Sequence, residues 1–272
     1  MSPEPTASEH RRTASRAGRT PSWLLGLAGL AGLAAVLEAV PRLGLVSPRY
    51  LPPFSRLVGA LAQQAGQREF WVALVETLRG WAVGLAIAVT AGVVVGLVIG
   101  SATGLRAITG STIEFLRPIP SVALIPLAVL LFGTNLRSTL LLVVYAAFWQ
   151  VLVQVLAGVA DVDPVAAETA RSFRLGTWAR LRHLTWPTAL PYLLTGVRLA
   201  AAVALVLAVT AELVIGSPGL GQEIAIAQSS NAVATLYALV VVTGLVGVAI
   251  NLLARLAERL LLPWHPSMRA PV

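Results

Sequence analysis

The chain has 272 residues, of which 57% are hydrophobic and 12% are charged, about half the charged fraction of a typical soluble domain. Its twenty basic residues are all arginine, and it contains no cysteine. This composition excludes a separate soluble domain, disulfides and thiolate metal sites. It predicts an all-α integral membrane protein whose helices span the bilayer in segments of about twenty residues.

The absence of lysine bears on how any ATP would be used. A P-loop needs the lysine of G-x-x-x-x-G-K-[ST] to reach the nucleotide phosphates. We therefore expect no cofactor in this chain, and any ATP that drives its function must bind a separate ATPase subunit. The three histidines, His10, His183 and His265, are scattered without metal-ligand spacing, so no metal site is expected.

The chain begins with a polar segment, and a long apolar core follows. Residues 1–22 are rich in Pro, Ser, Thr and Arg and are predicted to be a disordered cytoplasmic tail. Residues 23–40 form the first predicted transmembrane helix, which is not cleaved. Residues 41–71 are predicted to be an extracytoplasmic loop with a short amphipathic piece.

The core is predicted at residues 72–262, and residues 263–272 form a second cytoplasmic tail. Hydrophobic runs predict five spans in this core, at Val72–Gly100, Ile113–Gly133, Ser138–Gly158, Leu190–Gly216 and Ala232–Leu262. Six spans in all place both termini on the same side of the membrane. Twelve arginines fall in segments on that side and five on the other, which predicts cytoplasmic termini by the positive-inside rule. This distribution also argues against nucleic acid as the partner of the +8 charge.

A polar connection of about thirty residues, 159–191, separates two of the predicted spans. Asp163 can cap a helix and Pro164 suits its first turn, so we predict a helix through Phe173. Gly176 is predicted to end that helix. The connection therefore looks folded and lies outside the membrane.

A second short helix is predicted in the same connection. Thr177 can cap it, and it is expected to run to Trp186. Pro187 and Pro191 are expected to close it. Two short helices at the ends of two spans suit docking to a partner and transmission of force.

Small residues recur at every fourth position of the second span. They are Gly80, Gly84, Ala88, Gly92, Gly96 and Gly100. In lipid, small residues allow helices to approach closely. Two interpretations stay open, close packing inside one subunit and a seam between two copies, and we favour the first.

Ionisable groups at membrane depth are costly and usually functional. Glu212, late in the fifth span, is the clearest case, and we predict a role in an outer gate or in helix pairing. Glu76 and Arg79 are three residues apart on one helical face and are predicted to pair with each other.

Two further sets of residues have two interpretations each. Arg117, beside the helix-breaking Pro118 and Pro120, either lines a pathway or anchors at the interface, where it could pair with Glu114. Gln150 and Gln154, one turn apart, either line the pathway or bond to a neighbouring helix. No arrangement of a nucleophile with a base is present, so we expect no enzyme active site.

Several ordered motifs resemble one family. Glu168-Thr169-Ala170 with Trp186-Pro187 resembles the EAA loop of binding-protein-dependent ABC importer permeases. A wider set resembles the nitrate, sulfonate, taurine and bicarbonate branch of that family: residues 114–127, Phe132-Gly133, Ala211-Glu212 and Gly219-Leu220-Gly221. The family pattern usually has glycine six residues after the glutamate, where this chain has Arg174, so the geometry of the bend stays open.

The resemblance implies a fold and partners. The fold would be the six-helix, MetI-like fold of type I ABC importer permeases, in the bacterial inner membrane. The partners would be a pair of ABC ATPase subunits, an extracytoplasmic substrate-binding protein and a second permease subunit, with ATP bound by the ATPases. The solute would be a small anion. The alternative function is an ion-gradient-driven secondary transporter.

The resemblance also implies roles for particular residues. The loop that couples to the ATPase would include Ala166, Ala167, Glu168, Thr169, Ala170, Arg171, Gly176 and Pro187. Candidates for the pathway or gate are Arg117, Pro118, Pro120, Gln150, Gln154 and Glu212. The loop on the side of the binding protein would include Gly219 and Gly221.

Overall fold

The computed structural model describes residues 22–262, and all regular structure within this range is helical. The predicted tails, apart from Ser22, lie outside the described residues. The chain divides into two units, residues 1–56 and 57–272, and each is described by itself.

The first unit contains α1 (Ser22–Arg42) and the start of α2 (Phe54–Ala65). Helix α1 is long and apolar enough to cross a membrane. Near its end, the Glu38 carboxylate accepts hydrogen bonds from the Ser55 N–H at 2.8 Å and from the Ser55 hydroxyl at 3.0 Å. Glu38 also forms an ion pair with Arg42. One carboxylate therefore ties the end of α1 to the first turn of α2, the amphipathic helix that the sequence predicts.

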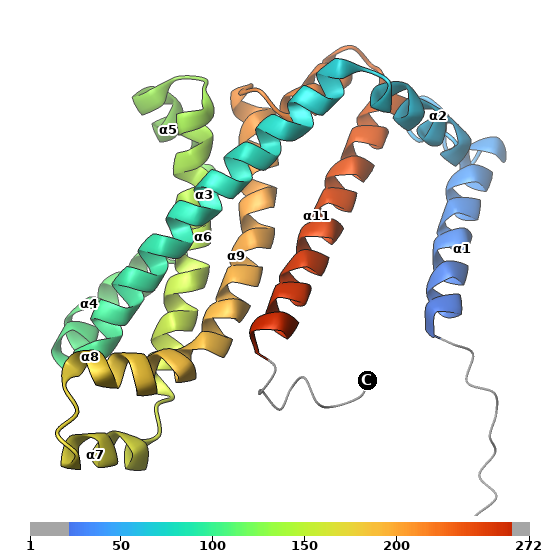
Figure 1. Cartoon of the computed structure of the whole chain (residues 1–272). Coiled ribbons are helices and arrows are strands. Elements are labelled where there is room, and N and C mark those ends of the chain that lie inside the picture. The colour runs from blue at the N-terminus through green and yellow to red at the C-terminus, as the bar shows by residue number, and fades with distance from the viewer. Residues whose placement is uncertain (1–21, 263–272) are drawn as a thin grey trace, which may run out of the picture. The chain divides into compact units, whose positions relative to one another are not determined.

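The second unit is built from long helices joined by short ones (Figure 1). In chain order they are α3 (Arg68–Ser101), α4 (Thr103–Leu116), the 3-10 turn η1 (Ser121–Leu124), α5 (Ile125–Phe132), α6 (Leu136–Ala160), α7 (Pro164–Ser172), α8 (Thr177–Arg180), the π turn η2 (Leu181–Thr185), α9 (Trp186–Ile215), α10 (Leu220–Ser229) and α11 (Val233–Leu261).

Helix α6 is the centre of this unit and packs against α3 on one side and α9 on the other. Its buried side chains, among them Leu142, Val151 and Val155, form the main core together with Ala88 of α3 and Ala204 of α9. The remaining surface of the long helices carries many exposed Leu and Val side chains. Apolar surface of this extent is what lipid or a second subunit covers.

The row of small residues on α3 faces α6. A Cβ atom added to Gly84 would lie 2.5 Å from Val143 Cγ1, and one added to Gly96 would lie 2.7 Å from Val155 Cγ1. These contacts are too short for any side chain larger than hydrogen. The row therefore serves packing inside one subunit, which confirms the favoured interpretation.

Five helices of the described chain are long and apolar enough to span a membrane, and a sixth span is possible if a bent pair counts as one. The bent pair is α4 followed by η1 and α5, with an angle of 81° between its halves. The fold is thus the predicted all-helical one with up to six spans.

The predicted third span needs a correction. Residues 103–112 belong to α4 rather than to a loop. The break that Pro118 and Pro120 predict inside this span is confirmed, because α4 ends at Leu116 and helical structure resumes at Ser121. The physical reason is Pro118 and Pro120, which cannot donate to the helical ladder and restrict the residues before them.

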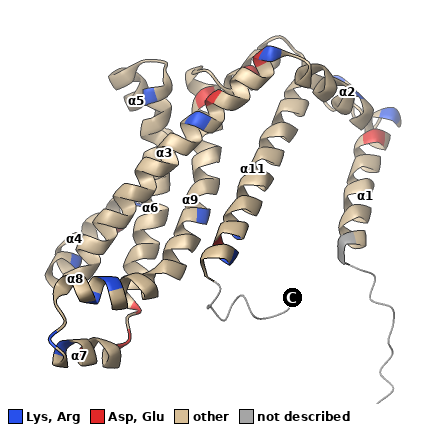
Figure 2. Ribbon diagram, viewed as in Figure 1, with Lys and Arg blue, Asp and Glu red and all other residues tan. Residues whose placement is uncertain are grey.

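Charged side chains lie mainly near the ends of the long helices and over α7 and α8 (Figure 2). The stretches between Arg79 and Ser101 on α3, and between Arg137 and Ala160 on α6, contain no charged residue. These uncharged stretches are the parts of the helices that suit the hydrocarbon layer.

Candidate functional site

The connection between α6 and α9 is folded, and its first helix starts as predicted. The Asp163 carboxylate accepts hydrogen bonds from the N–H groups of Val165 at 2.6 Å and Ala166 at 3.2 Å. Pro164 occupies the first turn of α7, where its missing N–H costs nothing. Because these interactions are local, the start of α7 is determined by its own sequence.

The end of α7 differs from the prediction. The helix ends at Ser172, and Arg174 takes a left-handed backbone conformation with φ of 53°. The Leu175 N–H donates to Ala170 O at 2.9 Å and the Arg174 N–H donates to Arg171 O at 2.9 Å, which is the Schellman pattern of helix ends.

Arg174 therefore occupies the bend position at which the family pattern usually has glycine. Gly176, with φ of −61°, comes after the bend and precedes the first residue of α8. The prediction that Gly176 ends the first helix is wrong, because a non-glycine residue accepts the left-handed conformation two positions earlier.

The prediction that Pro187 and Pro191 close the second helix is also wrong. Residues Thr177–Ile215 form one uninterrupted stretch of helix of 39 residues, which turns sharply between α8 and α9 (Figure 1). The Trp186 N–H reaches back five residues to Leu181 O. This wider π turn relieves the crowding that a proline imposes on the carbonyl four residues earlier. This bent helical stretch carries the connection into the membrane-spanning part of α9.

The outer face of α7 and α8 exposes large apolar side chains. Val165 is 71% exposed, Phe173 78% and Trp178 72%. Glu168 and Thr169 are also exposed, whereas Ala170 is buried against the rest of the connection. A folded segment outside the apolar spans that exposes such side chains is typical of a surface that contacts another protein.

Glu212 lies at the opposite end of α9 and is only 2% exposed. Its Oε2 accepts hydrogen bonds from the Thr77 hydroxyl at 2.8 Å and from the Gly221 N–H at 3.0 Å. Thr77 in turn accepts a hydrogen bond from the Leu220 N–H at 2.8 Å. Side chains of α9 and α3 thus cap the first turn of α10.

Gly219 and Gly221 are required by this arrangement. A Cβ atom on Gly219 would lie 2.2 Å from the carboxyl carbon of Glu212, and one on Gly221 would lie 2.2 Å from Val209 O. Both glycines let the backbone approach Glu212. The structure therefore brings the predicted gate residue Glu212 together with the two predicted loop glycines.

Thr77 and Ser217 are polar residues of this region that the sequence-based predictions missed. Both are buried, and Ser217 exchanges a hydrogen bond of 2.9 Å with Thr139 of α6. A signal for Thr77 was present, since it lies on the same helical face as Gly80 and Gly84. The structure also confirms the neighbouring Glu76–Arg79 pair at 3.7 Å.

The third group of candidates surrounds the break in the bent pair. The Tyr145 hydroxyl donates to Leu116 O at 2.7 Å, which places the break beside the middle of α6. Arg117 is exposed there, and among residues 22–262 it forms no ion pair with Glu114.

Gln150 and Gln154 lie on the face of α6 that meets α9. A Cβ atom on Gly196 would lie 2.9 Å from Gln154 Cβ and 3.3 Å from Gln150 O. The stem of Gln154 is therefore packed against α9. These residues lie apart from both the α7–α8 connection and the Glu212 cluster.

Comparisons with known proteins agree with this architecture. Residues 78–264 match the family model described as binding-protein-dependent transport system inner membrane component. The chain is 33% identical over 250 residues to the taurine transport system permease protein TauC of Escherichia coli K12, covering 90% of this chain and 91% of TauC. It is 28% identical over 245 residues to the putative aliphatic sulfonates transport permease protein SsuC of Bacillus subtilis 168, covering 90% and 89%.

Solved structures show the same fold. A chain of the MetNI methionine ABC transporter in an inward-facing conformation matches with a TM-score of 0.59 and 18% identity, covering 68% of this chain and 92% of that one. A chain from a bacterial ABC transporter for import of the polysaccharide alginate matches with a TM-score of 0.61 and 16% identity, covering 88% and 96%.

The chain belongs to the family of inner membrane permease components of binding-protein-dependent transport systems. It is a multi-pass membrane subunit of an ABC importer, without a catalytic role of its own, and such a system includes an ATPase and a binding protein. Family membership decides against the ion-gradient-driven secondary transporter.

Proposed function

We propose that this permease translocates a small anionic sulfonate, of which taurine is the model, after delivery by an extracytoplasmic binding protein. Two relatives that span about nine tenths of the chain are named for taurine and for aliphatic sulfonates. The exposed Arg117 beside the break in the α4–α5 pair supports this proposal. It forms no ion pair within the described part of the chain, and a guanidinium near unwound backbone attracts an anion.

The observation that carries the proposed coupling is the exposed apolar face of α7 and α8. Phe173 and Trp178 are each more than 70% exposed, and Glu168 lies exposed on the same helix as Val165. We assign this face, with the EAA-type residues 166–171, to the ATPase subunit. ATP-driven closure of two ATPases would then move α7.

The unbroken helical backbone from α8 to α9 supports transmission of that movement. Helix α9 alone has 30 residues and rises by about 45 Å at 1.5 Å per residue, which exceeds the hydrocarbon thickness of about 30 Å. The far end of α9 holds Glu212 and, through it, the start of α10. A movement of α8 would therefore pass to α9 through continuous helical backbone and reach the Glu212 cluster.

The remaining parts of the proposal concern assembly and orientation. Two copies of this chain would form the pathway between them. The α7–α8 connection and both termini would face the cytoplasm, in accordance with the arginine distribution. Gly219, Gly221 and α10 would then face the binding protein.

Site-specific cross-linking tests the assignment of the α7 face. Since the chain contains no cysteine, Thr169→Cys introduces a single thiol, and Ser230→Cys, exposed at the end of α10, is the matched control. We expect Thr169→Cys, but not Ser230→Cys, to cross-link to a co-expressed ATPase subunit carrying a cysteine in its docking surface. Equal yields from both positions, or no product from Thr169→Cys with any ATPase cysteine, would refute the assignment.

Titration of the partner binding protein tests the substrate. We expect taurine or a related sulfonate to bind it at least tenfold more tightly than methionine or an uncharged sugar. Preference for a cation or a neutral solute would overturn the sulfonate assignment and leave the permease assignment intact.

A further inference from the structure

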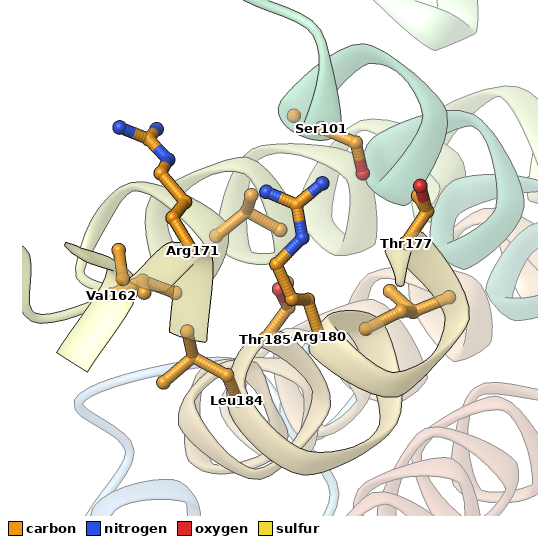
Figure 3. A pocket seen from close by; sticks show the side chains of 11 residues that line it. Ser101, Val162, Arg171, Thr177, Arg180, Leu184 and Thr185 are labelled. Atoms are coloured by element: carbon orange, nitrogen blue, oxygen red, sulfur yellow. The ribbon is translucent and has the colours of Figure 1, made fainter. Parts of the chain in front are cut away.

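A pocket of about 280 Å³ lies where the ends of α3 and α6 meet the α7–α8 connection. Its polar lining comes from Ser101 of α3, Arg171 of α7, Thr177 and Arg180 of α8, and Thr185 of η2 (Figure 3). No Asp or Glu lines it. The pocket therefore combines two positive charges with hydroxyl groups and no compensating negative charge.

Arg180 is the central group of this pocket. Its guanidinium extends into the space between Arg171 and the hydroxyls of Ser101 and Thr177 (Figure 3). Its Nε atom is buried and has no hydrogen-bond partner within the described residues, and no ion pair joins Arg180 or Arg171 to a carboxylate there. A buried donor of a charged group is costly unless an acceptor reaches it.

The other polar groups indicate what kind of acceptor fits. The hydroxyls of Thr177 and Thr185 form no hydrogen bond within residues 22–262 and are available as donors. The Ser101 hydroxyl already donates to Leu97 O. An arginine presents a fork of donors that matches the oxygens of a phosphate or sulfonate group, and such charge-assisted bonds are the strong ones.

We propose that this pocket binds a tetrahedral oxyanion of the phosphate class, either the headgroup phosphate of a lipid or free phosphate. Arg180 supplies the main contact, with Arg171 and the threonine hydroxyls completing the shell. None of the candidate pathway residues lines this pocket. Because its walls come from α3 and from the connection, a bound oxyanion would hold α7 and α8 against the end of α3 and so adjust how the connection moves.

The test compares three variants of the full chain purified with its ATPase partner. Arg180→Gln removes the central charge. Arg182→Gln, an exposed arginine two residues away that does not line the pocket, is the matched control. Arg171→Gln, whose side chain is exposed, is expected to fold normally and keeps the proposal testable if Arg180→Gln fails to fold.

Two measurements distinguish the two sources of the oxyanion. The first is the thermal unfolding midpoint in delipidated detergent, titrated with inorganic phosphate against chloride at constant ionic strength. The second is the number of phospholipid molecules retained per chain after purification in mild detergent, measured as lipid phosphorus. Loss of a hydrogen bond to a charged group is expected to weaken binding roughly ten- to hundredfold.

If the ligand is free phosphate, the unfolding midpoint rises with phosphate concentration for the wild type and Arg182→Gln. The half-saturating phosphate concentration then increases at least tenfold for Arg180→Gln and measurably for Arg171→Gln. If the ligand is a lipid headgroup, free phosphate does not change the unfolding midpoint. Arg180→Gln and Arg171→Gln then retain less phospholipid than Arg182→Gln. If neither measurement separates these two variants from Arg182→Gln, the pocket is not an oxyanion site.

Discussion

Removing the Glu212 carboxylate is expected to detach the start of α10 from α9 and α3. Its Oε2 accepts from both the Thr77 hydroxyl and the Gly221 N–H. In Glu212→Ala, both donors lose their acceptor in a buried environment, and each unsatisfied donor costs about 1–3 kcal/mol. We therefore expect a total loss of about 2–5 kcal/mol, with some relaxation around the cavity.

Glu212→Gln is expected to behave differently. The amide oxygen can occupy the position of Oε2 and accept both hydrogen bonds, while the NH₂ group replaces Oε1. Glu212→Gln should assemble at the wild-type level and show weakened transport, with little change in which solute is carried. The loss of transport would then report the charge rather than the packing.

Thermal unfolding of the purified complex measures the difference between the variants. At roughly 2–4 °C per kcal/mol for a chain of this size, Glu212→Ala should lower the midpoint by about 4–20 °C, and Glu212→Gln by much less. Thr77→Val, which removes the hydroxyl, should follow Glu212→Ala, whereas Thr77→Ser, which keeps it, should stay near the wild type. A Glu212→Ala midpoint equal to that of the wild type would refute the reasoning, and a change of selectivity in Glu212→Gln would place Glu212 in contact with the solute.

Three further predictions concern α3, the bend and the α7 face. Gly92→Ala should destabilise the chain by about 1–3 kcal/mol in thermal unfolding, because its Cβ would lie 2.8 Å from Val151 Cβ. Gly244→Ala, with open space around it, should not destabilise the chain. Equal effects of the two substitutions would refute the packing of α3 on α6. Arg174→Gly should preserve assembly and transport, since glycine adopts φ of 53° without strain. Arg174→Val should impair both assembly and transport. A fully active Arg174→Val would contradict the left-handed conformation at the bend. Glu168→Lys should uncouple ATP hydrolysis from uptake in vesicles without reducing the amount of permease in the membrane, and wild-type coupling would show that the Glu168 charge does not contribute to docking.

The start of α7, which depends on local interactions, was predicted accurately, whereas predictions that depended on distant partners were incomplete. Asp163 and Pro164 predict the start of α7 because a helix cap is formed by residues two or three positions away. The partner of Glu212 is Thr77, 135 residues earlier in the chain, and only the packed fold brings them together. Glu212 was recognised as unusual from the sequence, whereas its hydrogen bonds were not.

The errors arose where a residue accepts a conformation that another residue type adopts more readily. Arg174 takes the left-handed conformation that glycine favours, so Gly176 was the natural but wrong choice for the bend. Pro187 and Pro191 were expected to stop a helix, but a π turn precedes them and the helix continues. Prolines are tolerated in transmembrane helices, because neighbouring groups and local adjustments satisfy the freed backbone.

Uptake into reconstituted vesicles tests the central claim most directly. Vesicles would contain this chain and its ATPase partner, with the binding protein and labelled taurine supplied on the side opposite the ATPase. We predict uptake that requires ATP, the ATPase and the binding protein together, and that an imposed proton or sodium gradient does not replace. Uptake driven by an ion gradient without the ATPase, or ATP-driven uptake that needs no binding protein, would contradict the account.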